Sequence, residues 1–170
     1  MPECRIVTVV GNPKPASRTL TAAESVARSL LVLASGGTNT TIDLAGHGSD
    51  LLGWGSPAVG LLKATVLGAD ALVVASPTYK AAYTGLLKLF LDQFDKDELA
   101  GMPTVALMTG GSPHHALAVE VHLRPVLVEI GASLPTRGLY LAAAEVDDPA
   151  PVIARWLETA AEPLAVALNG

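Results

Sequence analysis

Residues 5–11 read RIVTVVG, a run of mostly β-branched apolar residues that ends in glycine. Such a run predicts a buried strand over residues 5–10. Residues 12–16 read NPKPA, and apolar side chains at helical spacing then follow from Ser17 to Leu33. This spacing predicts a helix, with Ser17 or Thr19 as its N-cap. A strand, a polar loop and a helix in this order are typical of one β/α unit.

The same alternation repeats along the rest of the chain. The pattern predicts further strands over residues 38–44, 70–76, 103–108 and 136–142, and further helices over 57–67, 84–94, 114–130 and 149–168, with loops over 45–56 and 77–83. Near-continuous apolar strands indicate a parallel sheet that is covered on both faces. Five such units favour one α/β domain over residues 1–170, a flavodoxin-like three-layer sandwich with a five-stranded parallel sheet of order 2-1-3-4-5.

Composition limits the possible partners. The 170 residues are 50% hydrophobic and 16% charged, with a net charge of −5 and no cluster of lysine and arginine, so nucleic acid is not expected as a partner. No apolar run is long enough to predict a membrane span, and the first residues do not resemble a secretion signal. With Cys4 as the only cysteine, we expect a cytoplasmic protein.

In a sheet of this order, ligands bind beyond the carboxyl ends of the strands, which directs attention to three loops. The first loop combines polar side chains, the cations Lys14 and Arg18, and a helix N-terminus, which together favour a phosphate group. The alternative is an ordinary turn in which Ser17 only caps the helix. The loop has neither the GxxxxGK[ST] nor the GxGxxG pattern, and it lacks the cysteine of a phosphatase loop.

The second and third loops favour a flat ligand. Tyr79 and Tyr83 lie close together in the second loop, where a ring could stack, although for Tyr83 a place in the core is favoured over a contact with the ligand. The third loop, residues 109–112, reads TGGS, and its glycines would let a ligand approach the backbone or simply form a turn. Three nearby histidines lack cysteine or carboxylate partners, so no metal site is expected; they are His114, His115 and His122.

These loops resemble those of the NADPH-dependent FMN reductase family, flavodoxin-like proteins, and particularly the reductases of two-component sulfonate monooxygenase systems. Residues 77–88, PTYKAAYTGLLK, are similar to the family segment P-x-Y-x-x-[SA]-Y-[ST]-G-x-L-K, and residues 109–118 to T-G-G-x-x-x-H-L-L-A. The similarity runs from about Arg5 to Tyr140. It implies that the FMN phosphate is held by Asn12, Lys14, Ser17, Arg18 and Thr19, and that the isoalloxazine is lined by Pro77, Thr78, Tyr79 and Lys80 and flanked by Thr109, Gly110, Gly111 and Ser112.

Two residues depart from the family pattern in the first loop. Asn12 lies where serine is usual, and Lys14 lies where arginine is usual. Because lysine offers a point charge rather than a bidentate fork, phosphate binding is expected to be weaker here.

The resemblance also implies an activity. The chain would transfer hydride from NADPH or NADH to flavin N5, with no catalytic proton-transfer residue, and supply reduced FMN to a partner monooxygenase. Two alternatives stay open: a reductase of quinones, azo dyes or nitro compounds with permanently bound FMN, and a flavodoxin-type electron carrier. The apolar residues of the helix over 84–94 exceed what one sheet face needs, which, with the resemblance, predicts a homodimer or homotetramer.

The helix predicted over residues 114–130 contains Pro125 in its interior. Proline cannot donate an N–H and crowds the carbonyl of Val121, so the helix is expected to kink or to adopt a π turn. In the sulfonate-system reductases this helix carries an inserted residue at an assembly interface, and Val121 takes that position here, beside His122. Our hypothesis is that these two residues loosen the contact and so alter flavin retention.

Overall fold

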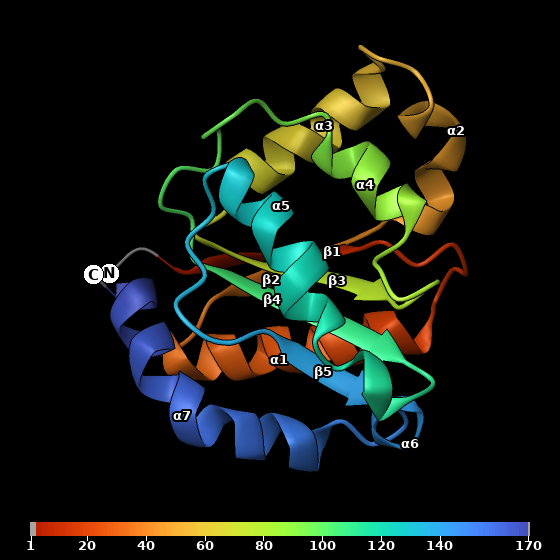
Figure 1. Ribbon diagram of the computed structural model, residues 1–170. Coiled ribbons are helices and arrows are strands. Elements are labelled where there is room, and N and C mark those ends of the chain that lie inside the picture. Colours follow the sequence, from red (N-terminus) through yellow and green to blue (C-terminus); the bar gives the residue numbers. More distant parts are fainter. Residues whose placement is uncertain (1–2, 170) are drawn as a thin grey trace.

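The computed structural model describes residues 3–169 and contains one parallel sheet (Figure 1). The order β2-β1-β3-β4-β5 confirms the predicted flavodoxin-like arrangement. In-register pairing aligns Val9 with Val74 and Val74 with Ala106, so the carboxyl ends of the central strands meet at one edge. The strands are β1 Arg5–Val10, β2 Thr38–Asp43, β3 Ala71–Pro77, β4 Thr104–Gly110 and β5 Leu139–Ala142.

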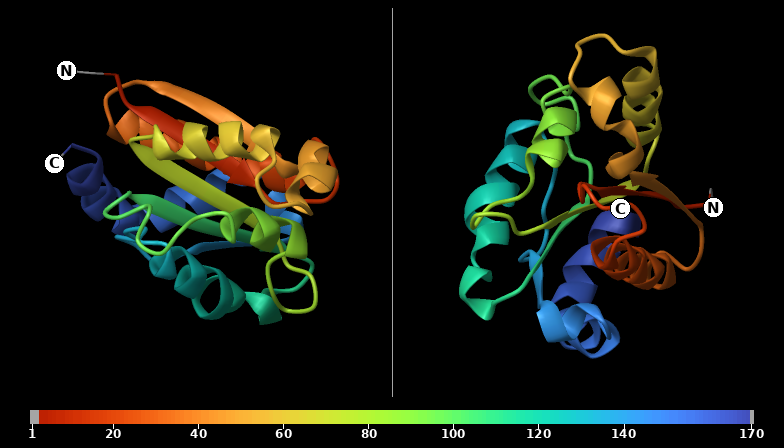
Figure 2. Two further views of the ribbon diagram at one scale, coloured as in Figure 1. Left: turned by 90° about the horizontal axis from the view of Figure 1, so that it is seen from above. Right: turned by 90° about the vertical axis from the view of Figure 1, so that its right-hand side faces the viewer.

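Helices cover both faces of the sheet, as expected. One face is covered by α1 Arg18–Leu33 and α7 Ala150–Asn169, and the other by α3 Pro57–Leu67, α4 Gly85–Leu91 and α5 Arg124–Glu129 (Figures 1 and 2). Successive strand residues point to opposite faces, so Val73 packs towards α1 and Val74 towards α4. Each face therefore has its own cluster of buried apolar side chains.

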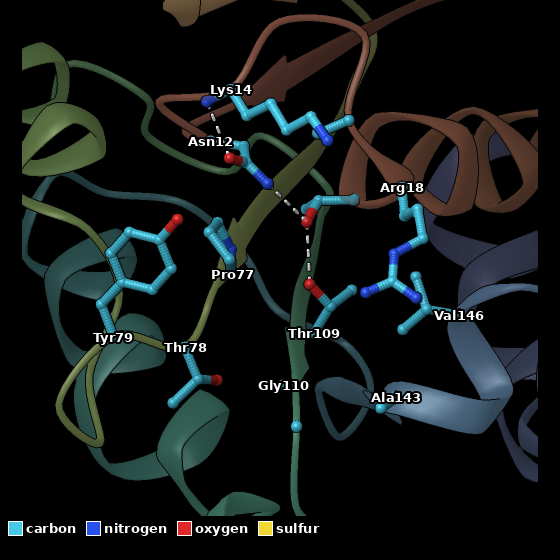
Figure 3. A pocket seen from close by; sticks show the side chains of 13 residues that line it. Asn12, Lys14, Arg18, Pro77, Thr78, Tyr79, Thr109, Gly110, Ala143 and Val146 are labelled. Atoms are coloured by element: carbon cyan, nitrogen blue, oxygen red, sulfur yellow. Dashed lines mark hydrogen bonds between the residues drawn. The ribbon is translucent and has the colours of Figure 1, made fainter.

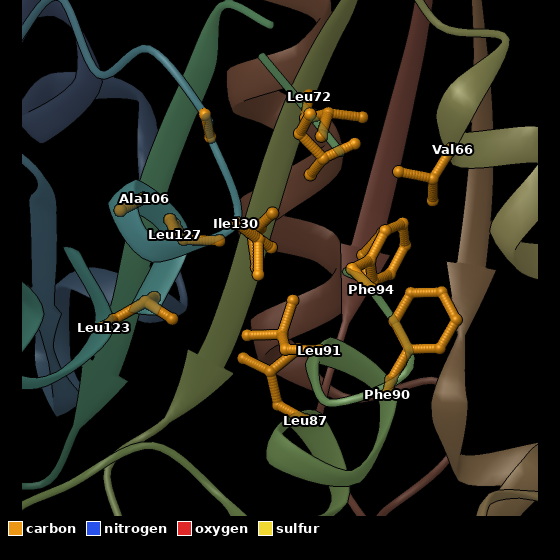
Figure 4. Close-up of a cluster of buried hydrophobic side chains, with 14 of the residues drawn as sticks. Val66, Leu72, Leu87, Phe90, Leu91, Phe94, Ala106, Leu123, Leu127 and Ile130 are labelled. Atoms are coloured by element: carbon orange, nitrogen blue, oxygen red, sulfur yellow. The ribbon is translucent and has the colours of Figure 1, made fainter. Parts of the chain in front are cut away.

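The cluster beneath α3, α4 and α5 is built around aromatic and leucine side chains (Figure 4). Phe90 and Phe94 meet edge to face with ring centroids 5.4 Å apart, and Leu87, Leu91 and Leu127 are buried beside them. The apolar residues of α4 are thus mostly used within the chain itself. The apolar surplus on this helix consequently gives little support to a homodimer or homotetramer, and assembly stays a prediction.

One segment forms short helices where a loop was expected, because buried side chains fix it. Residues 45–56 were expected to be a loop, but they begin within the 3-10 helix η1, Leu44–His47, which continues into α2, Gly48–Leu51. Leu44 and Leu51 are buried there in the same cluster as the apolar side chains of α4. Because one turn of helix carries no readable periodicity, this part of the prediction was wrong.

The last strand begins later than expected. The guanidinium of Arg124 donates to the carbonyls of Leu134 and Thr136, at 2.8 and 2.7 Å, and the N–H of Gly138 donates to the Glu120 carboxylate. These bonds replace strand pairing, so β5 starts only at Leu139. At the other end of the sheet, β4 runs two residues further than expected, to Gly110.

The segment over residues 114–130 is irregular, as its proline predicted. It begins with the 3-10 helix η2, Pro113–His115, passes through the π-helix η3, Val119–Leu123, and ends in α5. The N–H of Arg124 reaches five residues back to the carbonyl of Val119, just before Pro125. Val121 is 57% exposed and His122 is also exposed. Their effect on assembly and flavin retention stays a prediction.

None of the helices within residues 3–169 is long and apolar enough to cross a membrane.

Candidate functional site

A pocket of about 290 Å³ lies at the carboxyl ends of β1, β3 and β4 (Figure 3). The structure brings eleven of the thirteen predicted site residues to its wall. Lys80 and Ser112 are not among them, and the short helix α6, Ala143–Val146, adds two apolar residues that the sequence analysis missed. The full lining is Asn12, Lys14, Ser17, Arg18, Thr19, Pro77, Thr78, Tyr79, Thr109, Gly110, Gly111, Ala143 and Val146.

A buried chain of hydrogen bonds ties the first loop to β4. The amide of Asn12 accepts from the N–H of Lys14 at 2.9 Å and donates to the hydroxyl of Thr19 at 3.1 Å. That hydroxyl lies 2.8 Å from the hydroxyl of Thr109 (Figure 3). Asn12, Thr19 and Thr109 are each less than a tenth exposed. Their polar atoms are therefore largely engaged with one another, and they fix the floor of the pocket.

At the start of α1, backbone N–H groups without an acceptor in the helix lie beside the pocket. Ser17 is the N-cap, and its hydroxyl accepts from the N–H of Leu20 at 3.2 Å. The N–H groups of Arg18 and Thr19 precede the first intrahelical bond and have no acceptor within the helix. With the helix dipole they favour an anion. Ser17 therefore caps the helix and also lines the pocket, and its part in phosphate binding stays a prediction.

A carboxylate from β2 shapes the same loop. Asp43 accepts from the N–H of Ala16 at 3.1 Å and from the N–H of Ala45 at 3.2 Å. Ala16 has a φ of 47°, a left-handed conformation that costs free energy for a residue with a side chain. The bond to Asp43 helps to hold the loop in this conformation. Sequence reasoning missed this residue, because it lies 27 positions away along the chain.

The two cations of the loop differ in their partners. Lys14 is exposed and has no carboxylate partner among residues 3–169, whereas Nη1 of Arg18 lies 3.1 and 3.3 Å from the two carboxylate oxygens of Asp147. Both side chains of this pair are about two-thirds exposed. Figure 3 shows Arg18 extended beside Val146 at the mouth of the pocket. Positive charge is thus present at the end of the pocket where the helix begins.

The second loop is fixed by two buried hydroxyl groups. Ser76 accepts from the N–H of Thr84 at 3.0 Å, and Thr84 donates to the carbonyl of Gly11 and caps α4. Beyond this anchor, Tyr79 and Ala82 exchange two backbone bonds around a tight turn. Tyr79 is 53% exposed at the pocket rim, while Tyr83 packs partly buried against the core, as expected.

The turn explains why Lys80 does not reach the pocket. Lys80 and Ala81 form its tip, with φ values of 52° and 65°. Two central residues with positive φ are typical of a type I′ turn, in which asparagine and glycine are the preferred residues. The expected contact of Lys80 with the isoalloxazine has no support in this geometry.

The third loop is held by Tyr140. Its hydroxyl donates to the carbonyl of Ser112 at 2.6 Å, and burial raises the pKa of this phenol. A Cβ on Gly110 would collide with the same hydroxyl, whereas a Cβ on Gly111 would meet open space. Glycine is therefore needed at 110 to accommodate a tyrosine rather than a ligand. Ser112 instead caps η2, accepting from the N–H of His114 at 3.3 Å.

One polar atom in the wall is left without a well-aligned partner. The hydroxyl oxygen of Thr78 is buried and has no well-aligned hydrogen bond within residues 3–169, although it lies close enough to the Tyr140 phenol to lower the pKa of that group. Buried hydroxyl groups are normally paired, because an unsatisfied one costs roughly 1–3 kcal/mol. Figure 3 shows Thr78 on the side of the pocket opposite Arg18, next to Tyr79. The pocket thus joins an end with backbone N–H groups and cations, which favours an anion, to an end with Tyr79 and the buried Thr78 hydroxyl, an arrangement that suits FMN.

Residues 4–147 match the family model of the NADPH-dependent FMN reductases. The chain belongs to this family. Among curated relatives, the NADH-dependent FMN reductase SfnF of Pseudomonas putida is 43% identical over 79 residues, covering 46% of this chain and 42% of that protein. The FMN reductase (NADPH) of Escherichia coli strain K12 is 40% identical over 93 residues, covering 55% and 49%. The chain spans about half the length of the curated relatives it matches.

Solved structures match over almost the whole chain. An apo NADH:FMN oxidoreductase (EMOB) superimposes with a TM-score of 0.82 at 30% identity, over 98% of this chain and 91% of that one. An oxidoreductase from Corynebacterium diphtheriae gives a TM-score of 0.83 at 30% identity, over 98% and 97%. These matches confirm both the predicted fold and the resemblance to FMN reductases.

In this member of the FMN reductase family, four polar residues that sequence reasoning missed hold the pocket loops in place without lining the pocket. Asp43, Ser76, Thr84 and Tyr140 each bond to one of the three loops. The repeated pairing of a loop backbone with a distant hydroxyl or carboxylate leaves no local pattern in the sequence. Only the structure could assign these partners.

Proposed function

We propose that this chain is an NAD(P)H-dependent FMN reductase that supplies reduced FMN to a partner monooxygenase. The observation that carries the proposal is the pocket itself, which has a helix start that favours an anion at one end and the buried Thr78 hydroxyl beside Tyr79 at the other. Membership of the family and the activities of its relatives from Pseudomonas putida and Escherichia coli support the proposal.

Different residues would hold the phosphate and the isoalloxazine of FMN. The N–H groups of Arg18 and Thr19, with the side chains of Lys14 and Arg18, would hold the phosphate. Pro77, Thr78 and Tyr79 would lie along the isoalloxazine, with the backbone of Gly110 and Gly111 on its other side. A bound flavin would supply the acceptor for hydride from NADPH or NADH. The chain's own contribution is orientation, since no proton-transfer group is needed.

The assembly and location are also proposals. We expect a homodimer or homotetramer, and the exposed apolar side chains around η3 support it, because Leu117, Val121 and Val128 are each more than half exposed. A cytoplasmic location fits the single cysteine of the sequence.

Purified protein and both nicotinamide nucleotides test the proposal. Oxidation of NADPH or NADH should rise with added FMN, and the absorbance of the purified protein should show little flavin if FMN leaves as a product. A flavin that stays bound would favour the quinone, azo or nitro reductase alternative instead. If the bound flavin is reduced only by a protein partner and not by NADPH or NADH, the electron-carrier alternative would be favoured. If FMN stimulates the oxidation of neither nucleotide, the reductase proposal is wrong.

A further inference from the structure

Asp147 lies at the mouth of the pocket without lining it. It follows α6, whose residues Ala143 and Val146 form one wall, and its carboxylate contacts Arg18 at the start of α1. The ion pair therefore links the start of α1 to the end of α6, although its two residues are 129 positions apart in the sequence. The pocket lining itself includes no carboxylate. Asp147 is therefore an acidic group just outside the lining that pairs with the pocket cation Arg18.

The pair uses only part of the arginine. Both carboxylate oxygens contact the same nitrogen, Nη1, at 3.1 and 3.3 Å, so the guanidinium is not held in a two-nitrogen fork. With both side chains about two-thirds exposed, the pair is of the weak surface kind and can open at little cost. An incoming phosphate can therefore approach the same arginine.

We propose that Asp147 is a positioning residue that weakens the binding of the FMN phosphate by competing with it for Arg18. The inference rests on the proposed function and adds a determinant of how readily FMN is released. A phosphate monoester carries roughly −1.5 to −2 charges at neutral pH, and it would share one guanidinium with the carboxylate. The carboxylate of Asp147 and a phosphate bound at Arg18 would repel each other, and salt would screen this repulsion because the site is open to water.

The variant Asp147→Asn tests the competition directly. The amide keeps the shape of the side chain and removes its charge, so the dissociation constant of FMN should fall by about twofold to fivefold, the range of an exposed ion pair. Riboflavin has no phosphate, so its dissociation constant should stay unchanged. Both constants are measured by quenching of flavin fluorescence, which does not depend on turnover, and the FMN effect should shrink in high salt.

The next residue provides a matched control. Asp148 is exposed and has no ion pair within the described residues, so Asp148→Asn removes the same charge and should change the FMN constant by less than about 1.5-fold. Asp147→Ser serves as a second neutral variant, and thermal melting followed by circular dichroism checks that each variant folds. An unchanged or weakened affinity for FMN in folded Asp147→Asn would overturn the proposal.

The Arg18→Ala background separates competition from simple repulsion. If Asp147 acts through the arginine, Asp147→Asn should tighten FMN binding much less when Arg18 is absent. An equal gain in both backgrounds would overturn the competition. If the wild-type protein binds FMN more tightly than riboflavin but Asp147→Asn leaves the dissociation constant of FMN unchanged, this inference alone is contradicted. Wild-type protein that shows no preference for FMN contradicts the proposed phosphate site and this inference together.

Discussion

The hydroxyl of Thr19 connects the first loop to β4, and its removal should loosen the whole floor of the pocket. Thr19→Val keeps the volume and the β-branch but leaves the Asn12 amide and the Thr109 hydroxyl without their shared partner. Each lost bond costs about 1 kcal/mol, and a buried group left unpaired costs about 1–3 kcal/mol. Since Thr19 is 2% exposed, we expect the free energy of unfolding to fall by about 2–4 kcal/mol.

Urea unfolding followed by far-UV circular dichroism measures this change. Thr21→Val is the matched control, because Thr21 is exposed on the same helix and should change the free energy of unfolding by less than about 0.5 kcal/mol. Thr19→Val/Thr109→Val should cost less than the sum of its single variants, since removing both partners leaves fewer unpaired groups. A change in Thr19→Val as small as that of the control, or strict additivity, would refute the reasoning.

Three further changes test other parts of the structure. Ala81→Gly should raise the free energy of unfolding by about 0.5–1 kcal/mol in a urea titration, because glycine adopts the positive φ of this turn without strain, and Ala81→Val should lower it. Asp70 accepts from the Arg5 backbone and guanidinium, which lower its pKa, so Asp70→Asn should cost up to about 1 kcal/mol at neutral pH. Because the folded-state pKa is the lowered one, this difference should be present above about pH 4 and vanish as the pH falls through the folded-state pKa; a constant difference down to the acid transition would contradict it. Val121→Tyr should change flavin retention, measured by gel filtration of the FMN-loaded protein, without changing the difference between Arg18 and Arg18→Ala in FMN affinity.

The sheet and its order could be predicted because they depend on patterns that are continuous in the sequence. Residues 71–75 are apolar and buried on both faces, and such a run is typical of a central parallel strand. The irregular helix could also be predicted, since Pro125 lacks the N–H that a regular helix would need. Segments of four residues, such as η1, α2 and α6, are too short to show a helical period, and they were missed.

The sequence predicted where the candidate site lies better than it predicted what each residue does there. Loops at the carboxyl ends of β1, β3 and β4 had to meet, so most of the named residues lie in one pocket. Lys80 and Ser112 were placed by their neighbours in the sequence, but a tight turn and a helix cap direct them elsewhere. Backbone conformation at a single residue decides such cases, and the residue types alone do not reveal it.

The hydrogen bonds of the first loop change which groups can recognise a phosphate. Asn12 and Thr19 bond to each other, whereas Ser17 accepts one bond as the cap of α1 and keeps its own O–H free to donate. Recognition then falls to two backbone N–H groups, the Ser17 O–H and the exposed cations Lys14 and Arg18, and salt readily screens the two cations. We therefore expect the dissociation constant of FMN to rise with salt while that of riboflavin stays nearly constant. A flavin held in this way can leave after reduction, which suits a reductase that passes reduced FMN to another enzyme; salt-insensitive FMN binding would instead indicate a permanently held cofactor.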